Sequence, residues 1–209
     1  MSKILFAAIF LVFGLIGCAT LPDNPQLKLI SVGEYESVVA RNTEGAKVYD
    51  GFMNTMDFKA TLLNAEVVRA QADQNARIYQ WNPEQYEKEK ATSEANLQKE
   101  SQVYLSFFIP EKKYDDLAKP TTRWKIFLDA GGRRFEGKAA RIKAQLAEIT
   151  VLYPHHTRWQ TSYKLTFNVP MSVIEKDEKK ITLTGPVGSA SVTFKAPSNY
   201  RLSPESSPR

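Results

Sequence analysis

The feature that most constrains the fold is a strict alternation of apolar and polar side chains in the second half of the chain. Apolar residues stand at every second position from Val103 to Ile109, from Trp124 to Leu128 and from Tyr163 to Val169. Successive side chains of a β-strand point to opposite faces, so a period of two predicts strands with one buried face. Gly131-Gly132 predicts a hairpin turn between the second run and a strand over residues 133–138.

Shorter runs of the same kind extend the series toward both ends of the chain. We expect further strands over residues 38–48, 56–62, 149–153, 181–183 and 192–194. Roughly seven to nine short strands separated by polar turns favour an antiparallel sandwich. The lack of helices between the late strands argues against a parallel α/β sheet. The predicted fold is therefore mainly β, an antiparallel β-sandwich over residues 34–196 that resembles immunoglobulin-like and fibronectin-like domains, with Trp124 in its core.

One segment departs from the alternation and predicts a helical hairpin inserted at about residues 64–100. Apolar residues recur there at helical spacing, at Ala65, Val68, Ala72, Ala76 and Tyr79. Asn82 and Pro83 then suit the cap and first position of a second, strongly charged helix, with Gln85 in its first turn. This hairpin either covers one sheet or its edge, or projects as an arm that docks another envelope component.

The N-terminus carries the pattern of an export signal. Lys3 precedes thirteen uncharged residues, Ile4 to Ile16. A helix of that length spans roughly 20 Å, less than the ~30 Å hydrocarbon core of a bilayer. The run ends in Leu15-Ile16-Gly17-Cys18, which resembles the lipobox of bacterial lipoproteins. The other interpretation is that Cys18 ends an ordinary signal peptide or a membrane anchor.

The lipobox resemblance implies that residues 1–17 are removed and that Cys18 is acylated, for example with palmitate, and holds the protein in the membrane. Ala19 follows the cysteine in place of the aspartate that retains many such proteins in the inner membrane. The resemblance therefore implies the outer membrane, with the body on the periplasmic side. Residues 18–33 are expected to form a tether, and the Pro- and Ser-rich residues 197–209 a disordered tail.

Composition excludes several classes of protein. A single cysteine rules out a disulfide scaffold and a four-cysteine zinc site, and two histidines leave little for a His-rich metal centre. A formal net charge of +5 is too small to indicate nucleic-acid binding. No bound metal or cofactor is predicted.

Two sets of residues are candidates for binding. The first is basic and lies around the predicted hairpin, at Arg133, Arg134, Lys138 and Arg141. It suits an anionic glycan, lipid headgroups or an acidic protein, or it simply keeps an edge hairpin soluble. The second is His155-His156 with Arg158, in a connection between two predicted strands. It is either a ligand-contacting loop or a structural one, in which Pro154, Trp159 and Tyr163 close the end of the sandwich.

The sequence contains no Gly-x-Ser-x-Gly elbow, no HExxH motif and no phosphate-binding glycine loop. It therefore predicts a membrane-anchored lipoprotein that is a non-enzymatic binding or structural module of the cell envelope. The alternative is an accessory domain of an envelope hydrolase or transferase, with an active site assembled from dispersed residues.

Overall fold

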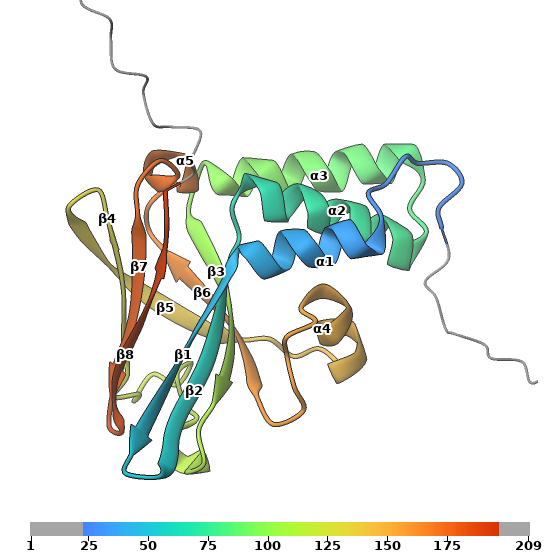
Figure 1. The fold of residues 1–209 in the computed structure, drawn as a ribbon. Helices are drawn as coiled ribbons and strands as arrows, with labels where there is room; N and C mark the ends of the chain where they lie inside the picture. Colours follow the sequence, from blue (N-terminus) through green and yellow to red (C-terminus); the bar gives the residue numbers. More distant parts are fainter. Residues whose placement is uncertain (1–22, 197–209) are drawn as a thin grey trace, which may run out of the picture.

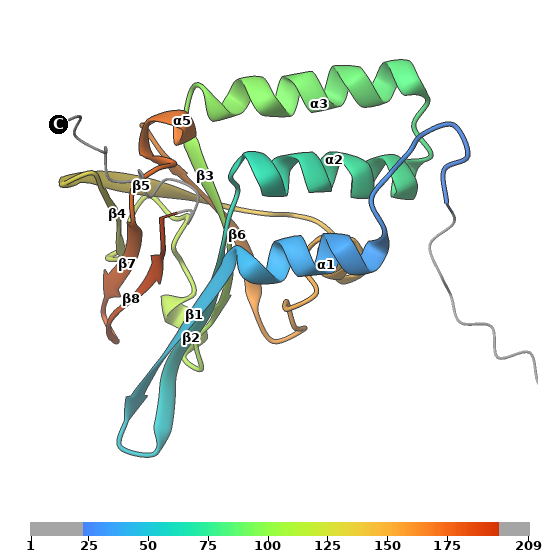
Figure 2. The ribbon, with the colours of Figure 1, turned by 45° about the horizontal axis from the view of Figure 1, so that its top comes forward.

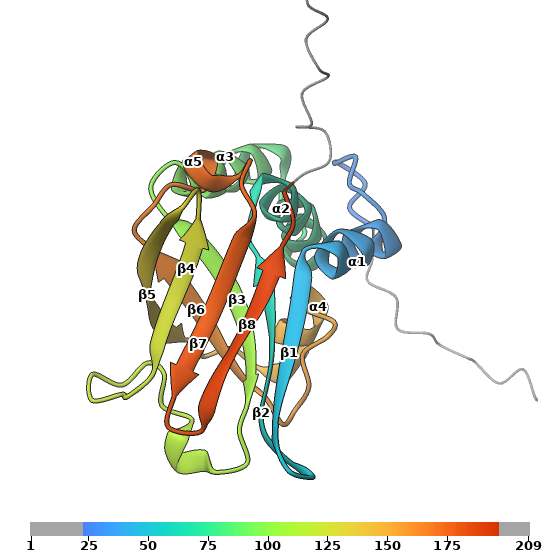
Figure 3. The ribbon, with the colours of Figure 1, turned by 60° about the vertical axis from the view of Figure 1, so that its left-hand side comes forward.

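The computed structural model describes residues 23–196, in which eight strands form one antiparallel sheet ordered β1-β2-β3-β6-β5-β4-β7-β8. The strands are β1 (Thr43–Asp50), β2 (Met53–Leu62), β3 (Ser101–Phe108), β4 (Lys125–Ala130), β5 (Arg133–Arg141), β6 (Thr161–Phe167), β7 (Lys179–Gly185) and β8 (Gly188–Phe194). The sheet curls until β1 and β8 lie side by side, although the two are not paired (Figure 3). The β-rich, antiparallel prediction is confirmed. A sandwich of the immunoglobulin type is not confirmed, because the strands follow one another in a single, nearly closed sheet.

The described residues form the helices α1 (Val32–Arg41), α2 (Ala65–Tyr79), α3 (Pro83–Leu97), α4 (Leu146–Leu152) and α5 (Met171–Ile174), and a short 3-10 turn spans Lys112–Tyr114. The first three, α1, α2 and α3, lie together on one side of the sheet (Figures 1 and 2). The predicted helical hairpin corresponds to α2 and α3. Asn82 accepts a hydrogen bond from the Gln85 amide, and the Gln85 side chain accepts one from the Asn82 amide, so the predicted start of α3 is confirmed as a capping box.

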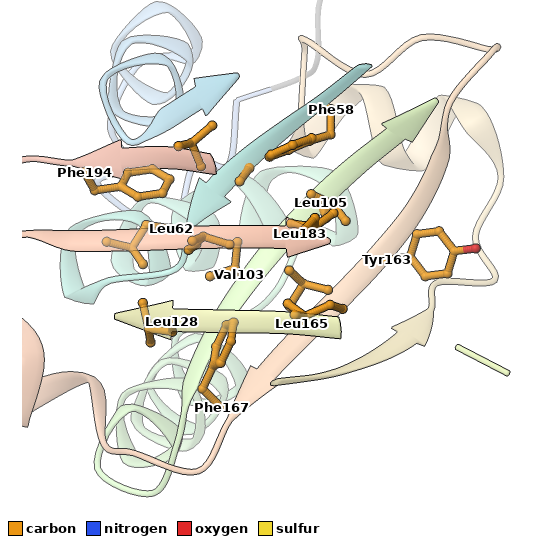
Figure 4. Packing of buried hydrophobic residues seen from close by; sticks show 14 of the residues in the cluster. Phe58, Leu62, Val103, Leu105, Leu128, Tyr163, Leu165, Phe167, Leu183 and Phe194 are labelled. Atoms are coloured by element: carbon orange, nitrogen blue, oxygen red, sulfur yellow. The ribbon is translucent and has the colours of Figure 1, made fainter. Parts of the chain in front are cut away.

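The main core fills the concave face of the curled sheet with side chains from all parts of the strand series (Figure 4). Trp124 is 3% exposed, as predicted, and its ring stands edge-on to Phe107 at 5.4 Å between centroids. Gly185 makes room for this ring, since a Cβ there would lie 2.4 Å from it. The apolar residues of the alternating runs are therefore the ones whose side chains point into this core.

A second, smaller core lies between the helices and the outer face of β3. Tyr35 and Val39 of α1, Val67 of α2 and Ile149 of α4 pack there against Tyr104. Because β3 is covered on both faces, six of its eight residues are buried. This covering layer attaches α1, α2 and α4 to the sheet.

The prediction of a strand over residues 38–48 is wrong in its first part, because residues 32–41 form α1. Ser31 caps this helix by accepting a hydrogen bond from the Glu34 amide at 3.1 Å. Tyr35, Val38 and Val39 are spaced by three and four residues and bury one helical face. The strand β1 begins after the helix, at Thr43.

The strand predicted at residues 149–153 is also wrong, because most of that segment belongs to α4. Ile149, Val151 and Tyr153 alternate, but Ile149 and Tyr153 are also four residues apart and both are buried. The Tyr153 amide donates to the Ile149 carbonyl at 2.7 Å, which is a helical bond. So short an apolar run satisfies both periods, and tertiary packing selects the helix.

Part of the segment predicted as a tether, residues 18–33, is bound to the folded domain. The Asn24 amide group donates to the carbonyl oxygens of Ala76, at 3.3 Å, and Trp81, at 2.8 Å. The Ile30 amide donates to Asp73 at 2.9 Å, and Arg77 donates to the Ile30 carbonyl. From Asn24 onward the chain is therefore part of the folded body.

Candidate functional site

The basic candidates lie on β5, and the structure divides them between the two faces of that strand. By alternation, Arg134 and Lys138 point to one face, and Arg133 and Arg141 to the other. They do not form one patch. The β5 strand lies between β6 and β4 in the sheet, so the interpretation of these residues as the charges of an edge hairpin is wrong.

Arg134 is neutralised by its neighbour across the hairpin. Its Nε and Nη2 atoms donate to the two carboxylate oxygens of Asp129 at 2.7 and 2.9 Å. These hydrogen bonds hold the pKa of Asp129 below its usual range. Arg133 lies over the Phe135 ring at 5.1 Å. Within residues 23–196, no ion pair or ring contact holds the exposed side chains of Lys138 and Arg141, which lie one on each face.

His155 and His156 join a network on the outer face of β3. The hydroxyl groups of Tyr104 and Ser106 lie 2.8 and 2.7 Å from Nδ1 of His156, which is 5% exposed. The Tyr104 ring stacks on Tyr153, and His155 stands edge-on to both tyrosine rings at 6.0 and 6.2 Å. The network fastens the segment after α4 to the sheet.

Burial controls the charge of both imidazoles. It lowers the pKa of His155 to about 4, with a further contribution from Lys59, and it also lowers the pKa of His156. Both rings are therefore neutral at pH 7. A Ser–His contact such as that of Ser106 and His156 resembles a nucleophile and its base. The Ser106 side chain, however, is completely buried, so here the contact serves packing.

Arg158 lies outside this network, on the surface. Its guanidinium group stands over the Trp159 ring at 4.6 Å, and Trp159 is 63% exposed. The prediction that Trp159 closes an end of the fold is therefore wrong. The turn from Thr157 to Gln160, closed by a 2.9 Å bond from the Thr157 amide to the Gln160 side chain, directs the indole outward.

A surface that the sequence analysis missed lies at the tip of the β1–β2 hairpin. Tyr49, Phe52 and Met53 are 57%, 106% and 73% exposed. They flank a turn in which Gly51 takes a φ of +58°, and a bulge separates Val48 from Tyr49. The Asp50-Gly51 pair is a hairpin signal that could have placed these side chains at a tip. Scattered exposed apolar residues are common, but three within five positions make the tip unusually apolar. Met53 lies opposite Asp50 and Tyr49 lies opposite Asn54, so Met53 and Tyr49 occupy opposite faces of the hairpin, with Phe52 in the turn between the strands.

The first described residues, from Asp23 to Ile30, and this tip lie at opposite ends of the described part of the molecule (Figures 1 and 2). Cys18 lies outside the described residues, which begin five positions later at Asp23. Among residues 23–196, no helix has the length and apolar character needed to cross a membrane. Within the same range, no group of three or more His, Cys, Asp or Glu side chains is placed to hold a metal ion.

The chain was compared with protein-family models, with curated proteins and with solved structures. None of the three comparisons finds a match.

Proposed function

We propose that the protein is a lipid-anchored component of the bacterial cell envelope, a non-enzymatic module that binds another envelope protein. Acylated Cys18 is its membrane anchor, in the outer membrane with the body on the periplasmic side. The lipobox resemblance of residues 1–18 supports the anchor. The observation that carries the binding role is the exposed apolar tip of the hairpin, where Phe52 and Met53 are adjacent and Tyr49 lies on the other face.

The folded body limits how such an anchored molecule is oriented. Six peptide units separate Cys18 from Asn24, a reach of at most about 20 Å. Asn24 is held against the end of α2 and the turn before α3. This end would therefore stay near the bilayer, and the hairpin tip would point away from it.

The chemistry of the tip favours a protein partner with an apolar pocket. Phe52 makes almost no contact with its own chain, so its burial by a partner would add stabilisation without loss of an existing contact. Aromatic and methionine side chains are enriched in the buried centres of protein interfaces. The carboxylate of Asp50 beside them opposes insertion into an anionic membrane surface.

Replacement of Phe52 and Met53 by serine tests the binding role. A photo-crosslinking amino acid at position 52 should capture one discrete envelope protein in cells, and a detergent-stable complex with it should be lost in the Phe52→Ser/Met53→Ser variant. Val173→Ser, at an exposed apolar residue of α5, is the matched control and should bind normally. Unchanged complex formation by the double variant would disprove the role of the tip.

Replacement of the anchor residue tests the membrane attachment separately. Cys18→Ser should leave the protein unprocessed or release it from membranes, because the chain has no other thiol to acylate. The measurement is membrane fractionation with mass spectrometry of the N-terminus. Normal maturation and membrane retention of this variant would refute the lipid anchor.

A further inference from the structure

The helices α2 and α3 run side by side (Figure 2), and a cleft of about 280 Å³ lies between their facing sides. Gln71 and Asn75 line it from α2, and Ser93 and Asn96 line it from α3. These residues are three or four positions apart in each helix, so each pair belongs to one helical face. Trp81, in the turn that joins the helices, also lines the cleft.

The α3 side of the cleft is mostly polar because α3 has almost no apolar face to pack on α2. The apolar part of the lining comes from Leu63, Val68 and Ala72, and from Leu97 of α3. Leu97, at its end, is the one buried residue of this helix. Polar contacts hold the two helices together. The Tyr86 hydroxyl donates to Asp73 at 2.7 Å, and Arg69 pairs with Glu94 at 2.7 Å. Leucines at the positions of Ser93 and Asn96 would have packed on Val68 and Ala72 and closed the pair, but α3 has a hydroxyl and an amide there.

Most of the amide and hydroxyl groups that line the cleft from α2 and α3 form no hydrogen bonds with the rest of the described chain. The side chains of Asn75, Ser93 and Asn96 make no hydrogen bond within the part of the chain that the structure describes. Gln71 uses its amide N–H on the Tyr153 hydroxyl at 2.9 Å, which leaves its carbonyl oxygen. Each amide both donates and accepts, so the cleft offers paired donors and acceptors to a ligand.

The charge and the aromatic wall restrict the class of ligand. Glu89 and Glu100 line the cleft, and among residues 23–196 no Lys or Arg does, so an anion is disfavoured. Trp81 is supported by Tyr79, at 6.1 Å between ring centroids and 21° between planes. An indole wall suits a ligand that is apolar on one face and polar at its edges. The volume is just below the ~300 Å³ at which small-molecule sites begin.

We infer that the cleft between α2 and α3 is a binding site for a neutral saccharide of one or two rings. The ring face of a sugar carries C–H groups that pack on Trp81, and its hydroxyl groups both donate and accept, as the amides of Asn75 and Asn96 do. The inference goes beyond the proposed function and is independent of the Cys18 anchor and of the hairpin tip.

The test is a titration of the full-length protein, solubilised in a detergent without a sugar headgroup. The probes are N,N′-diacetylchitobiose and cellobiose, with galacturonic acid as the anionic comparison. Tryptophan fluorescence and saturation-transfer NMR should report saturable binding of at least one neutral probe, with a Kd on the order of 1 mM. Trp81→Ala and Asn75→Leu/Asn96→Leu should each weaken it at least tenfold, whereas Trp159→Ala should leave it unchanged.

A circular dichroism melt of each variant separates loss of binding from loss of folding. If Trp81→Ala does not fold, the Asn75→Leu/Asn96→Leu variant still decides the question, because its residues form no hydrogen bonds that the fold needs. Failure of both neutral probes to bind at concentrations tenfold above that Kd would overturn the inference. Preferential binding of galacturonic acid, or equal binding by the cleft variants and the parent, would overturn it too.

Discussion

The Trp124 side chain stabilises the main core in two ways, through packing of its apolar ring and through a hydrogen bond from its ring N–H. Its ring packs on Phe107 and Gly185, and its Nε1 donates to the Tyr114 carbonyl at 2.8 Å. Trp124→Ala should therefore lower the free energy of unfolding by about 3–5 kcal/mol. Denaturant titration measures the change. Trp159→Ala, at an exposed ring, should stay within about 0.5 kcal/mol of the parent, and equal midpoints for the two variants would contradict the packing of Trp124.

His155 couples stability to pH. Its pKa of about 4 in the folded chain lies below its value of 6.5 in the unfolded chain, so the unfolded chain binds the proton first as pH falls. The contribution of His155 is therefore fully present above pH 6.5 and is lost as pH falls toward 4. Between pH 7.5 and pH 5.5 the free energy of unfolding should fall by about 1 kcal/mol from this group.

The comparison of the parent with His155→Gln isolates that contribution. Glutamine does not titrate, so the variant should lose less stability than the parent between pH 7.5 and pH 5.5. The measurement is urea unfolding at both pH values, chosen above the range in which carboxylates titrate. Parallel pH dependence of the two proteins would show that His155 is not buried as described.

Among the secondary-structure elements, the stability of α3 depends more on the capping of its N-terminus than on the packing of its side chains. With one buried residue, it gains little from packing, so the capping box at Asn82 and Gln85 carries an unusual share of its stability. Asn82→Ala should destabilise the helix by about 1 kcal/mol. Hydrogen exchange of the α3 amides should accelerate accordingly, while Asn82→Asp, which keeps an accepting oxygen, should retain protection. Equal exchange in Asn82→Ala and the parent would contradict this.

The secondary-structure elements also show where sequence patterns succeed and where they fail. In the β3 and β6 segments, four apolar residues stand at every second position. In the β4 segment three do so, and the Gly131-Gly132 turn follows. These patterns predict the three strands correctly. The α4 segment is short, and its apolar residues satisfy a strand period and a helix period together. In α1, Val38 and Ala40 alternate as in a strand, whereas the buried Tyr35, Val38 and Val39 follow the helical period. The identity of both segments depends on Tyr104, which offers a buried surface to Tyr35 and Tyr153 from the outer face of β3.

At the level of the whole molecule, the unpaired seam between β1 and β8 distinguishes the curled sheet from a closed one. The β3 and β6 strands have a hydrogen-bonded neighbour on each side. Their amides should exchange with solvent only when the whole chain unfolds. Amides of β8 that face β1 should exchange much faster than those of β8 that face β7, which serve as the internal control. Uniformly slow exchange along β8, measured by NMR, would mean that the seam is hydrogen-bonded.

The sequence by itself determined the strand-rich character of this protein, the position of its two long helices and the burial of Trp124, because each depends on a local period or cap. It also carries the lipobox resemblance at Cys18. Tertiary structure decided that the strands form one curled sheet, that Asn24 to Ile30 pack on α2, and that the basic residues of β5 diverge. It also decided that the hairpin tip and the α2–α3 cleft are open to solvent. These features depend on which segments meet in space, and residues far apart in the chain set those contacts without leaving a periodic signal in either segment.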